Sequence, residues 1–334
     1  MITELINGSD AFTLLANEWD DLAQRGITDT PFQTLAYQKA WWTHLHPENG
    51  RLRTITVRND QKKLLAIASL YNVDGTLYFN GCVEETDYLD LITTPDHAEM
   101  AWQAILDCLC SPNFPKWHSI DLCNIPEASP SRTILAQEAQ RRGFLFNETL
   151  NEVCPIIPLA DSFNAYLSGI GSKQRREINR KLRRAKGAEA ELVVVGSEDD
   201  IDTAVSDFLD LLQKSTFEKR DWLNDGRRAV FYEAARAAQK AGTLQLLFME
   251  VGGKKAAGLF NFDYKDRIWV YNSGLDPALF GALSLGVVIT AKAIEFAIEN
   301  GRATFDFLRG NETYKYRFGA EDTTIYRIHM EPAS

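Results

Sequence analysis

A pattern repeated at an offset of 192 residues constrains the fold of this chain more than any other feature. Residues 62–81 read KKLLAIASLYNVDGTLYFNG, and residues 254–274 read KKAAGLFNFDYKDRIWVYNSG. At this offset Asn80 falls on Asn272. Each segment contains two apolar and aromatic runs around a polar turn, a pattern that predicts a β-hairpin.

The elements expected after each hairpin follow the same order. The first hairpin is followed by a helical pattern at residues 97–110 and a strand at Ser119–Cys123, the second by a helix at residues 284–300 and a strand at Thr304–Leu308. A strand–helix–strand crossover implies that the flanking strands pair in parallel. The repeat therefore predicts two duplicated domains of the α/β (α+β) class.

The boundary between these domains is expected near residues 150–161. The segment Val153–Leu159 (VCPIIPL) has the pattern of a strand with two prolines, which suits a sheet edge or a crossover between domains. A chain of 334 residues accommodates two domains of ~150 residues each. We predict domains at residues 1–155 and 156–334.

The composition is that of a globular protein, with 45% hydrophobic and 25% charged residues. The N-terminal residues MITELINGSD lack the basic and apolar regions of a secretory signal, and no apolar run reaches the ~18 residues of a membrane span. We therefore expect a cytoplasmic protein. The five cysteines form no CxxC pair and no metal-ligand spacing, so we expect reduced, mostly buried thiols and no metal site.

The charge distribution is uneven. The net charge of −10 argues against a general DNA, RNA or membrane binder. Residues 172–186 nevertheless carry a local charge of +7, so the remainder of the chain carries −17. Ile178, Leu182 and Ala185 fall on one face of a helix in this segment. The helix is either a plain surface helix or a helix that binds a polyanion through residues such as Arg175 and Arg176.

The segment 306–319 holds the densest group of charged and aromatic residues. Asp306 lies between two phenylalanines on an expected strand, where an acid is unfavourable unless it is paired or exposed. One interpretation is a buried pair of Asp306 with Arg309 that holds a loop. The other is a ligand site, because charged groups meet at the C-terminal ends of parallel strands.

The start of the second expected helix is a candidate anion site. A loop of small residues leads to Ser284, Leu285 and Gly286. A helix N-terminus exposes unpaired N–H groups and a partial positive charge, so it can receive a pyrophosphate. Gly286 would let a phosphate approach the backbone closely.

Four segments carry a family resemblance that spans about residues 10–330. DFLRGNETYKYRFGA (306–320) resembles the closing signature of the FemAB-like, CelD-like branch of the GNAT superfamily, in which a strand Asp is followed by an Arg-Gly turn and a Tyr-Lys-x-x-Phe-Gly segment. PFQTLAYQKAWW (31–42) resembles the opening helix of that branch, and DYLDLI (87–92) its first-domain loop and strand. SKQRREINRKLRRA (172–185) resembles the basic helix that opens its second domain.

The resemblance implies tandem GNAT domains, each a mixed twisted sheet flanked by helices. It further implies an acyl-CoA donor without a metal, with an acyl-carrier protein as an open alternative. The acceptor would be a small-molecule or glycan-linked amine: an amino sugar, an amino acid or an envelope or exopolysaccharide precursor. The first domain would be degenerate and lie on the acceptor side. The related Fem ligases use aminoacyl-tRNA, but this chain lacks their long inserted helical hairpin.

The resemblance also implies roles for individual residues in acyl transfer. The donor is expected in a groove between strands Ala256–Asp263 and Ile268–Ser273. Asp306 or Glu312 would accept the proton of the amine, with Asp306 preferred because burial raises a carboxyl pKa. Lys315 would stabilise the oxyanion, and Tyr314 or Tyr316 would protonate the leaving thiolate.

The remaining predicted site residues form two groups. The donor-binding residues are expected to be Tyr271, Ser273, Gly274, Ser284, Leu285 and Gly286. The acceptor-binding residues are expected to be Trp42, Asp87, Tyr88, Arg175, Arg176 and Trp222. A non-catalytic module that binds a polysaccharide or a protein partner is the alternative from another class, and the presence of Asp306, Arg309 and Lys315 disfavours it.

Overall fold

The computed structural model describes residues 1–82 and 85–333, which form two units. The first unit comprises Met1–Glu152 and the C-terminal residues from Thr324 on, and the second comprises Val153–Thr323. The chain thus enters the second unit just before the predicted boundary at residue 155. Its last residues return to the first unit, whereas the sequence placed them in the second.

The first unit is a mixed sheet with helices on both faces. Its strands, in spatial order, are β1 (Ile2–Asn7), β2 (Arg51–Arg58), β3 (Leu64–Val73), β4 (Thr76–Phe79), β6 (Ser119–Pro126) and the end of β13 (Glu321–Pro332), with β5 (Ile92–Thr93) paired to β3. Its helices are α1 (Asp10–Leu14), α2 (Trp19–Ala23), α3 (Leu35–Leu45), α4 (Ala98–Leu109) and α5 (Ser131–Arg142). Two separate apolar cores result, one beneath α4 and α5 and one beneath α1, α2 and α3.

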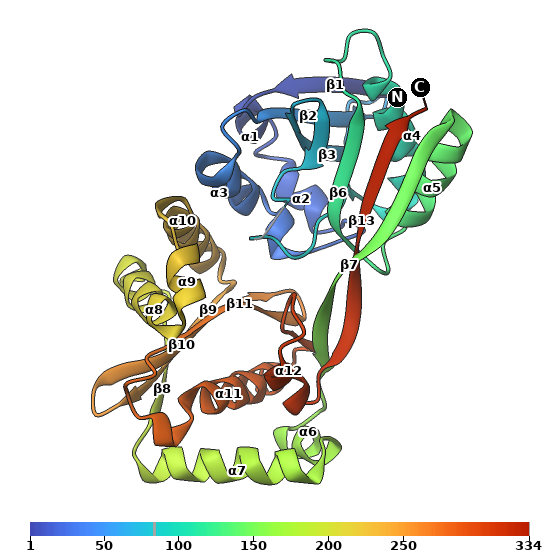
Figure 1. Ribbon diagram of the computed structural model, residues 1–334. Coiled ribbons are helices and arrows are strands. Elements are labelled where there is room, and N and C mark those ends of the chain that lie inside the picture. Colours follow the sequence, from blue (N-terminus) through green and yellow to red (C-terminus); the bar gives the residue numbers. More distant parts are fainter. Residues whose placement is uncertain (83–84, 334) are drawn as a thin grey trace. The chain divides into compact units, whose positions relative to one another are not determined.

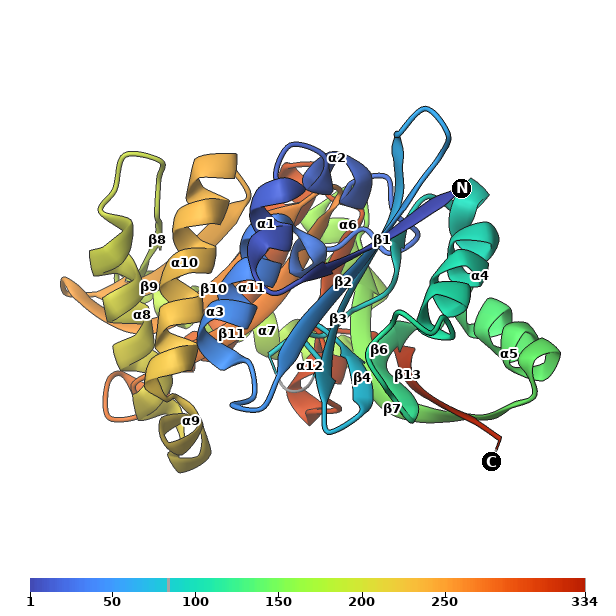
Figure 2. The same cartoon turned by 90° about the horizontal axis from the view of Figure 1, so that it is seen from above.

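The second unit is also a mixed sheet between helices. Its strands, in spatial order, are β8 (Glu191–Val194), β9 (Leu244–Val251), β10 (Lys254–Tyr264), β11 (Arg267–Leu275), β12 (Thr304–Asp306) and the end of β7 (Phe144–Pro158). Its helices are α6 (Phe163–Gly169), α7 (Ser172–Gly187), α8 (Ile201–Ser215), α9 (Phe217–Trp222), α10 (Asp225–Ala241), α11 (Leu285–Glu299) and α12 (Thr313–Arg317). In Figure 1, α11 lies between this sheet and α7. Figure 2 shows α8 and α10 side by side.

The duplicated order of elements predicted from the repeat is confirmed. Each unit contains a hairpin, a helix and a strand that returns parallel to the hairpin: β3–β4, α4 and β6 in the first, and β10–β11, α11 and β12 in the second. Leu77 pairs in parallel with Ile120, and Ile268 with Phe305. β7 and β13 each continue from one unit into the other: the end of β7 pairs with β12 in the second unit, and the end of β13 pairs with β6 in the first.

The cores of the second unit follow from the sequence pattern of its helices. In α7, Ile178 and Ala185 are buried on one face, as predicted, and the opposite face is charged. The residues of α11 are apolar on most sides because the helix is covered by the sheet on one side and by α7 on the other. On the opposite face of the sheet, rings from α8, α10 and the hairpin pack together: Phe208, Phe231, Phe260, Phe262 and Tyr271.

One expectation about the cysteines is wrong. Cys82 and Cys123 form a disulfide in the first unit, although 41 residues separate them in the chain. Cys108, Cys110 and Cys154 are free thiols, and Cys110 is exposed. Within residues 1–82 and 85–333, no cluster of His, Cys, Asp and Glu could hold a metal ion. In the same residues, no helix combines the length and the apolar character needed to cross a bilayer.

Candidate functional site

Strand β11 diverges from β12 shortly after the two strands begin to pair. Their parallel pairing runs only from Arg267–Thr304 to Trp269–Asp306, while β11 continues beside β10 to Leu275. The last part of β11, residues 270–275, therefore has an edge that β12 does not cover. The groove predicted between β10 and β11 is wrong, because these two strands are paired along their length. The opening lies on the other side of β11.

Side chains of α8, α9 and β11 itself bond to this open edge. The Leu275 amide donates to Ser215 Oγ at 2.7 Å, and the Ser273 amide donates to Asn272 Oδ1 at 2.9 Å. Lys219 Nζ donates to the Ser273 carbonyl and, at 3.1 Å, to Asn272 Oδ1. These groups satisfy backbone atoms that a neighbouring strand would otherwise pair.

The first turn of α11 lies against the end of the same strand. A Cβ atom added at Gly286 would lie 3.5 Å from Leu275 Cδ2. Ser284 precedes the helix with a left-handed φ of 55°, and its side chain does not cap the helix. Among the described residues, the amides of Leu285 and Gly286 have no hydrogen-bond acceptor. An anion can therefore bind to these amides.

The basic helix α7 reaches the loop that precedes these amides. Arg184 Nη1 donates to the carbonyl of Ala282 at 2.9 Å. Its exposed guanidinium adds positive charge beside the N-terminus of α11, where the helix dipole already favours an anion. Two other basic residues, Arg180 and Lys181, pair with Glu177 on α7 itself. Of the two predicted contact residues on this helix, Arg175 is half-buried and Arg176 is exposed.

Asp306 holds β11 and β12 together at the point where they diverge. It is fully buried, and it accepts hydrogen bonds from Arg267 Nη1 at 3.0 Å and from the Leu308 amide at 2.8 Å. The sequence suggested an ion pair with Arg309, and it placed Arg267 only in the hairpin turn. Arg267 and Asp306 are adjacent through the parallel register, which no local motif encodes. The role of Asp306 as a base stays a prediction.

Lys315 is buried, with only 2% of its surface exposed. Its ammonium contacts the carbonyls of Leu308, Arg309 and Gly310 at 3.1, 2.6 and 2.9 Å, and Glu312 Oε2 at 2.9 Å. An ammonium has three N–H donors, so these acceptors saturate it. Lys315 therefore fixes the turn after β12, and the predicted contact with an oxyanion would require one of these bonds to open.

The remaining C-terminal candidates are closer to solvent. The ring of Tyr314 is 40% exposed and lies edge-on to Phe307, with 5.9 Å between the centroids. Tyr316 donates its hydroxyl to Asp322 at 2.7 Å. Glu312 is more than half exposed. Tyr314 and Glu312 are thus the predicted groups that a ligand can reach without a change in the fold.

Three predicted acceptor residues belong to the first unit and are buried there. Trp42 stacks on His46 with 4.6 Å between the rings, and Asp87 and Tyr88 are 8% and 5% exposed. The neighbouring Asp90 accepts from the hydroxyls of Thr28, Ser129 and Ser131 and from the Leu91 amide. Burial raises the pKa of Asp90, and the hydroxyl donors partly offset this effect. This network indicates that Asp90 ties three segments of the first unit together.

Two further predicted residues face the aromatic side of the second unit. The ring of Trp222 lies edge-on to Phe231, and the Arg227 guanidinium lies 4.8 Å from its centroid. Gly274 faces α8 closely, because an added Cβ would lie 2.6 Å from the Leu212 amide nitrogen. Gly274 therefore permits α8 to pack on β11 rather than leaving room for a ligand.

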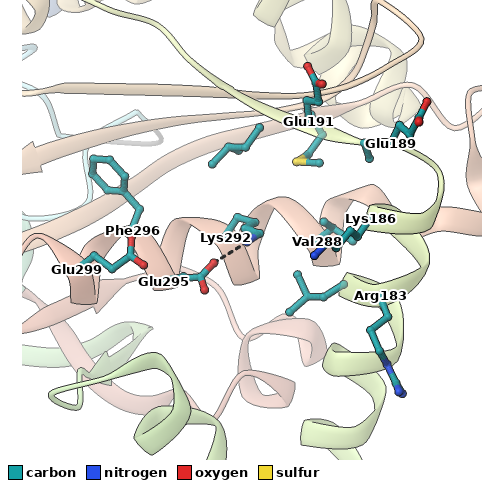
Figure 3. A pocket seen from close by; sticks show the side chains of 14 residues that line it. Arg183, Lys186, Glu189, Glu191, Val288, Lys292, Glu295, Phe296 and Glu299 are labelled. Atoms are coloured by element: carbon teal, nitrogen blue, oxygen red, sulfur yellow. Dashed lines mark hydrogen bonds and ion pairs between the residues drawn. The ribbon is translucent and has the colours of Figure 1, made fainter.

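Two pockets lie in the second unit. A pocket of ≈ 990 Å³ lies between α7, α11 and the β8–β9 edge (Figure 3). Three basic and four acidic side chains line it, and Lys292 pairs with Glu295 there, so its lining does not suit a polyphosphate. A second cavity of ≈ 680 Å³ lies where α8 passes into α9, and Ser215, Asp276 and Pro277 are among its lining residues. This second cavity adjoins the end of β11.

Residues 172–316 match the model of a family described as an acetyltransferase (GNAT) domain. This segment is a GNAT domain. The match covers less than half of the chain, and it contains β8 to β12, α7 to α12 and the open edge of β11. The predicted GNAT-type transferase is thereby confirmed. The predicted tandem fold is confirmed as well, because the first unit repeats the hairpin, helix and parallel strand of the GNAT segment.

Several solved structures share the fold of the whole chain. The structure of FemX has a TM-score of 0.66 at 12% identity, and the match covers 97% of this chain and 96% of that one. The C-terminal domain of a putative lysylphosphatidylglycerol synthetase from Agrobacterium fabrum gives 0.61 at 8%, covering 95% and 92%. L-PGS from Bacillus licheniformis gives 0.56 at 10%, covering 84% and 85%. Identities this low show a common fold only. No curated protein matches the chain.

The residues that the sequence analysis missed lie where α8 and α9 meet the GNAT segment's open strand. Lys219, Ser215 and Asn272 bond to the edge of β11. Lys219 lies in the polar run Glu218-Lys219-Arg220, which looks like an ordinary solvated segment. The only available signal was the repeat itself, which marks Asn272 as the counterpart of Asn80.

Proposed function

We propose that this protein is an N-acyltransferase that moves an acyl group from acyl-CoA to a primary amine. The amine would belong to an amino sugar, an amino acid or an envelope or exopolysaccharide precursor. The observation that carries the proposal is the open edge of β11 with the unbonded amides of Leu285 and Gly286 at its end. An extended arm with an anionic tail fits this combination.

The pantetheine arm of CoA is such an extended chain, with two amide groups. An extended ligand can add to a free strand edge through main-chain hydrogen bonds. The amides and carbonyls of Ser273 and Leu275 face this edge, and side chains occupy them in the structure. The donor would exchange those side-chain bonds for its own, while its pyrophosphate binds at Leu285 and Gly286 beside Arg184.

The thioester carbonyl would then lie near the point where β11 and β12 separate. Acyl transfer to an amine needs stabilisation of the oxyanion and a proton donor for the thiolate. Backbone N–H groups of the diverging β11 and the exposed Tyr314 are the groups we assign to these two tasks. The residues that bind donor and acceptor would position them for reaction. Such positioning can lower the activation barrier by roughly 7 kcal/mol or more in ideal cases.

Calorimetric titration of the full chain with acetyl-CoA and octanoyl-CoA tests the proposal. We expect micromolar binding that is lost in Gly286→Leu, whose side chain would cover the free amides. Gly187→Leu is the matched control, because a Cβ added there meets no atom within 4 Å. Equal loss of binding in both variants, or no binding by the unaltered protein, would contradict the proposed donor site.

A second candidate is aminoacyl transfer from aminoacyl-tRNA. The fold shared with FemX and with a lysylphosphatidylglycerol synthetase domain favours it, as does the fact that side chains already occupy the β11 edge. A chain that fails to bind either acyl-CoA but releases tRNA from an aminoacyl-tRNA would support this alternative. A chain that does neither would be a non-catalytic module that has kept the fold.

A further inference from the structure

Lys219 is the titratable group closest to the open edge of β11. It extends from the short helix α9, and its Nζ contacts the Ser273 carbonyl, Asn272 Oδ1 and Ser273 Oγ. All three partners are uncharged. Among the described residues, no carboxylate lies within ion-pair distance of this nitrogen, which separates Lys219 from Lys255 and Lys315.

Burial of Lys219 disfavours its charged form, whereas its three hydrogen-bond acceptors favour it. Burial lowers the pKa of Lys219 to about 8, and the negative charge of Glu312 partly offsets this effect. Other charged groups near α9 are engaged elsewhere: Lys214 at the end of α8 pairs with Asp276, and Arg220 with Asp221. With a pKa of about 8, about half of the Lys219 side chains are neutral amines near pH 8, and about a tenth at pH 7.

The position of this amine matters because of the proposed function, on which the inference rests. If the donor arm adds to the edge at Ser273 and Leu275 with its thioester carbonyl where β11 and β12 separate, the carbonyl carbon lies a few residues along β11 from the atoms that Lys219 now contacts, and the long lysine side chain would turn toward it. An attacking amine must approach that carbon with its lone pair free, yet it arrives as an ammonium ion. A proton acceptor within hydrogen-bond reach of the amine is therefore required.

We propose that Lys219 is the catalytic proton acceptor for the incoming amine. The acceptor ammonium transfers one proton to neutral Lys219, and the resulting amine forms the C–N bond to the acyl carbon. The tetrahedral intermediate expels the donor sulfur, and the C–S bond breaks. The nitrogen loses its second proton as it becomes an amide; one of the two protons ends on the thiolate and the other passes to solvent.

The buried carboxylate of Asp306 is less suited to this task. It is fully buried and pairs with Arg267, so it holds β11 to β12. The first unit has a similar pair at the corresponding strand, Asp121 with Arg327. Both aspartates thus join their own strand to a neighbouring strand, β11 in the GNAT segment and β13 in the first unit, which indicates a structural role.

Competitive labelling with acetic anhydride tests the position and the titration of Lys219 together. The full chain is labelled between about pH 6 and pH 10, alone and saturated with acetyl-CoA, and each lysine is quantified by peptide mass spectrometry. We expect Lys219 to react at lower pH than the exposed Lys240 and to be protected at least ~10-fold by acetyl-CoA. Titration like that of Lys240, or no protection by bound acetyl-CoA, would overturn the inference.

Kinetics with two acceptors separate proton removal from a structural role. Glucosamine must lose a proton before it attacks, whereas hydroxylamine is already neutral at pH 7. Lys219→Gln should lower kcat/KM for glucosamine roughly 10²–10⁴-fold and that for hydroxylamine far less. In the unaltered protein the rate with glucosamine should rise with pH and level off above about 8, and the variant should lose this break. Lys240→Gln is the control.

The outcomes distinguish this inference from the proposed function. If Lys219→Gln binds acetyl-CoA normally but loses both acceptors equally, Lys219 is a structural residue and the inference is wrong. If acetyl-CoA binds and glucosamine turnover is unchanged in the variant, another group accepts the proton. If the unaltered protein does not bind acetyl-CoA, the proposed function is wrong, and so is the inference that rests on it.

Discussion

In the first unit the strand β4 is followed by Asn80, and in the second unit the repeat places Asn272 at the corresponding point of β11. Asn80 is fully buried and exchanges hydrogen bonds with Gln38, a neutral amide that is itself buried. Asn272 instead accepts from Lys219, which is partly exposed and titratable. The same position thus contacts a buried amide in one half and a titratable lysine in the other.

Under the proposed function, this difference would explain how a duplicated fold keeps one working half. Amide–amide bonds in a buried site are costly to break because both partners would be left without hydrogen bonds. Lys219 is only partly buried, and its long side chain would let the ammonium leave the strand edge and become solvated. The first half is closed by its packing, and the second half can open to a ligand.

The largest expected effect concerns the two Asp–Arg pairs. Asp306→Ala removes a fully buried carboxylate, so the Leu308 amide loses its acceptor and the partly exposed Arg267 loses its partner, which we expect to cost about 2–4 kcal/mol. Asp121→Ala should cost roughly 1 kcal/mol, because the side chain of Arg327 is 50% exposed and can be solvated. Urea unfolding, with hydrogen exchange to locate the loss in β11–β12 or in β6–β13, measures both. Equal costs would mean that the two pairs are buried alike.

A smaller effect is expected from two glycines that flank the open edge. In Gly274→Ala the added Cβ would lie 2.6 Å from the Leu212 nitrogen and 2.8 Å from the Leu211 carbonyl carbon, so the backbone of α8 must shift. We expect a loss of about 1–3 kcal/mol. Gly286→Ala is the control, because its Cβ makes an ordinary contact and alanine favours a helix by about 0.5–1 kcal/mol. Thermal unfolding compares them; an unstable Gly286→Ala would contradict the described start of α11.

The pair of asparagines tests the comparison directly. Asn80→Ala removes the side-chain donor to Gln38 Oε1 and to the Gln38 carbonyl at a buried site, which we expect to cost about 1–3 kcal/mol, while Gln38 Nε2 keeps the main-chain carbonyls of Phe32 and residue 80. Asn272→Ala should cost under about 1 kcal/mol, because Lys219 keeps its bond to the Ser273 carbonyl. Chemical denaturation of the two variants gives the difference. If Asn272→Ala is the more harmful change, the second half is sealed as firmly as the first.

The fold was predictable from the sequence to the extent that periodicity and the repeat encode it. Two hairpins, two helices and two returning strands follow from alternating apolar residues and from the offset between residues 62–81 and 254–274. The continuation of β7 and β13 from one unit into the other was not predictable, because a long strand that enters a second sheet has the same residue pattern as one that stays in a single sheet. The Cys82–Cys123 disulfide was missed for a related reason: its cysteines share no motif, and the fold alone brings them together.

For the proposed site, the sequence indicated a place in the fold but not the contacts around it. The sequence pointed to the end of β11 and the start of α11, and both contribute backbone groups that a donor can use. It did not reveal that Asp306 is paired through the strand register with Arg267, or that Lys315 is saturated by three carbonyls. Such contacts depend on which segments, far apart in the sequence, the fold brings together in space. Lys219 was not predicted as a site residue, because no sequence pattern distinguishes a partly buried lysine from a solvated one in a charged helix.

The smallest expected effect is the pH dependence of stability due to Lys219. Burial lowers its pKa to about 8, whereas an unfolded chain releases the proton near ~10.4. Below about pH 8 both states carry the proton and burial of the charge costs stability. Between about pH 8 and pH 10 the unfolded state binds more protons, so stability should rise with pH.

Lys219→Met removes this rise, and its advantage over the unaltered protein should shrink as the pH increases from about 7 to about 9.5. Urea midpoints at the two pH values measure the difference, and Lys240→Met, at an exposed lysine, should show none. Parallel pH profiles for the unaltered protein and Lys219→Met would mean that the ammonium is fully solvated. The two halves would then differ only in packing. The contact of Asn272 with a lysine would give the second half no titratable group with a lowered pKa.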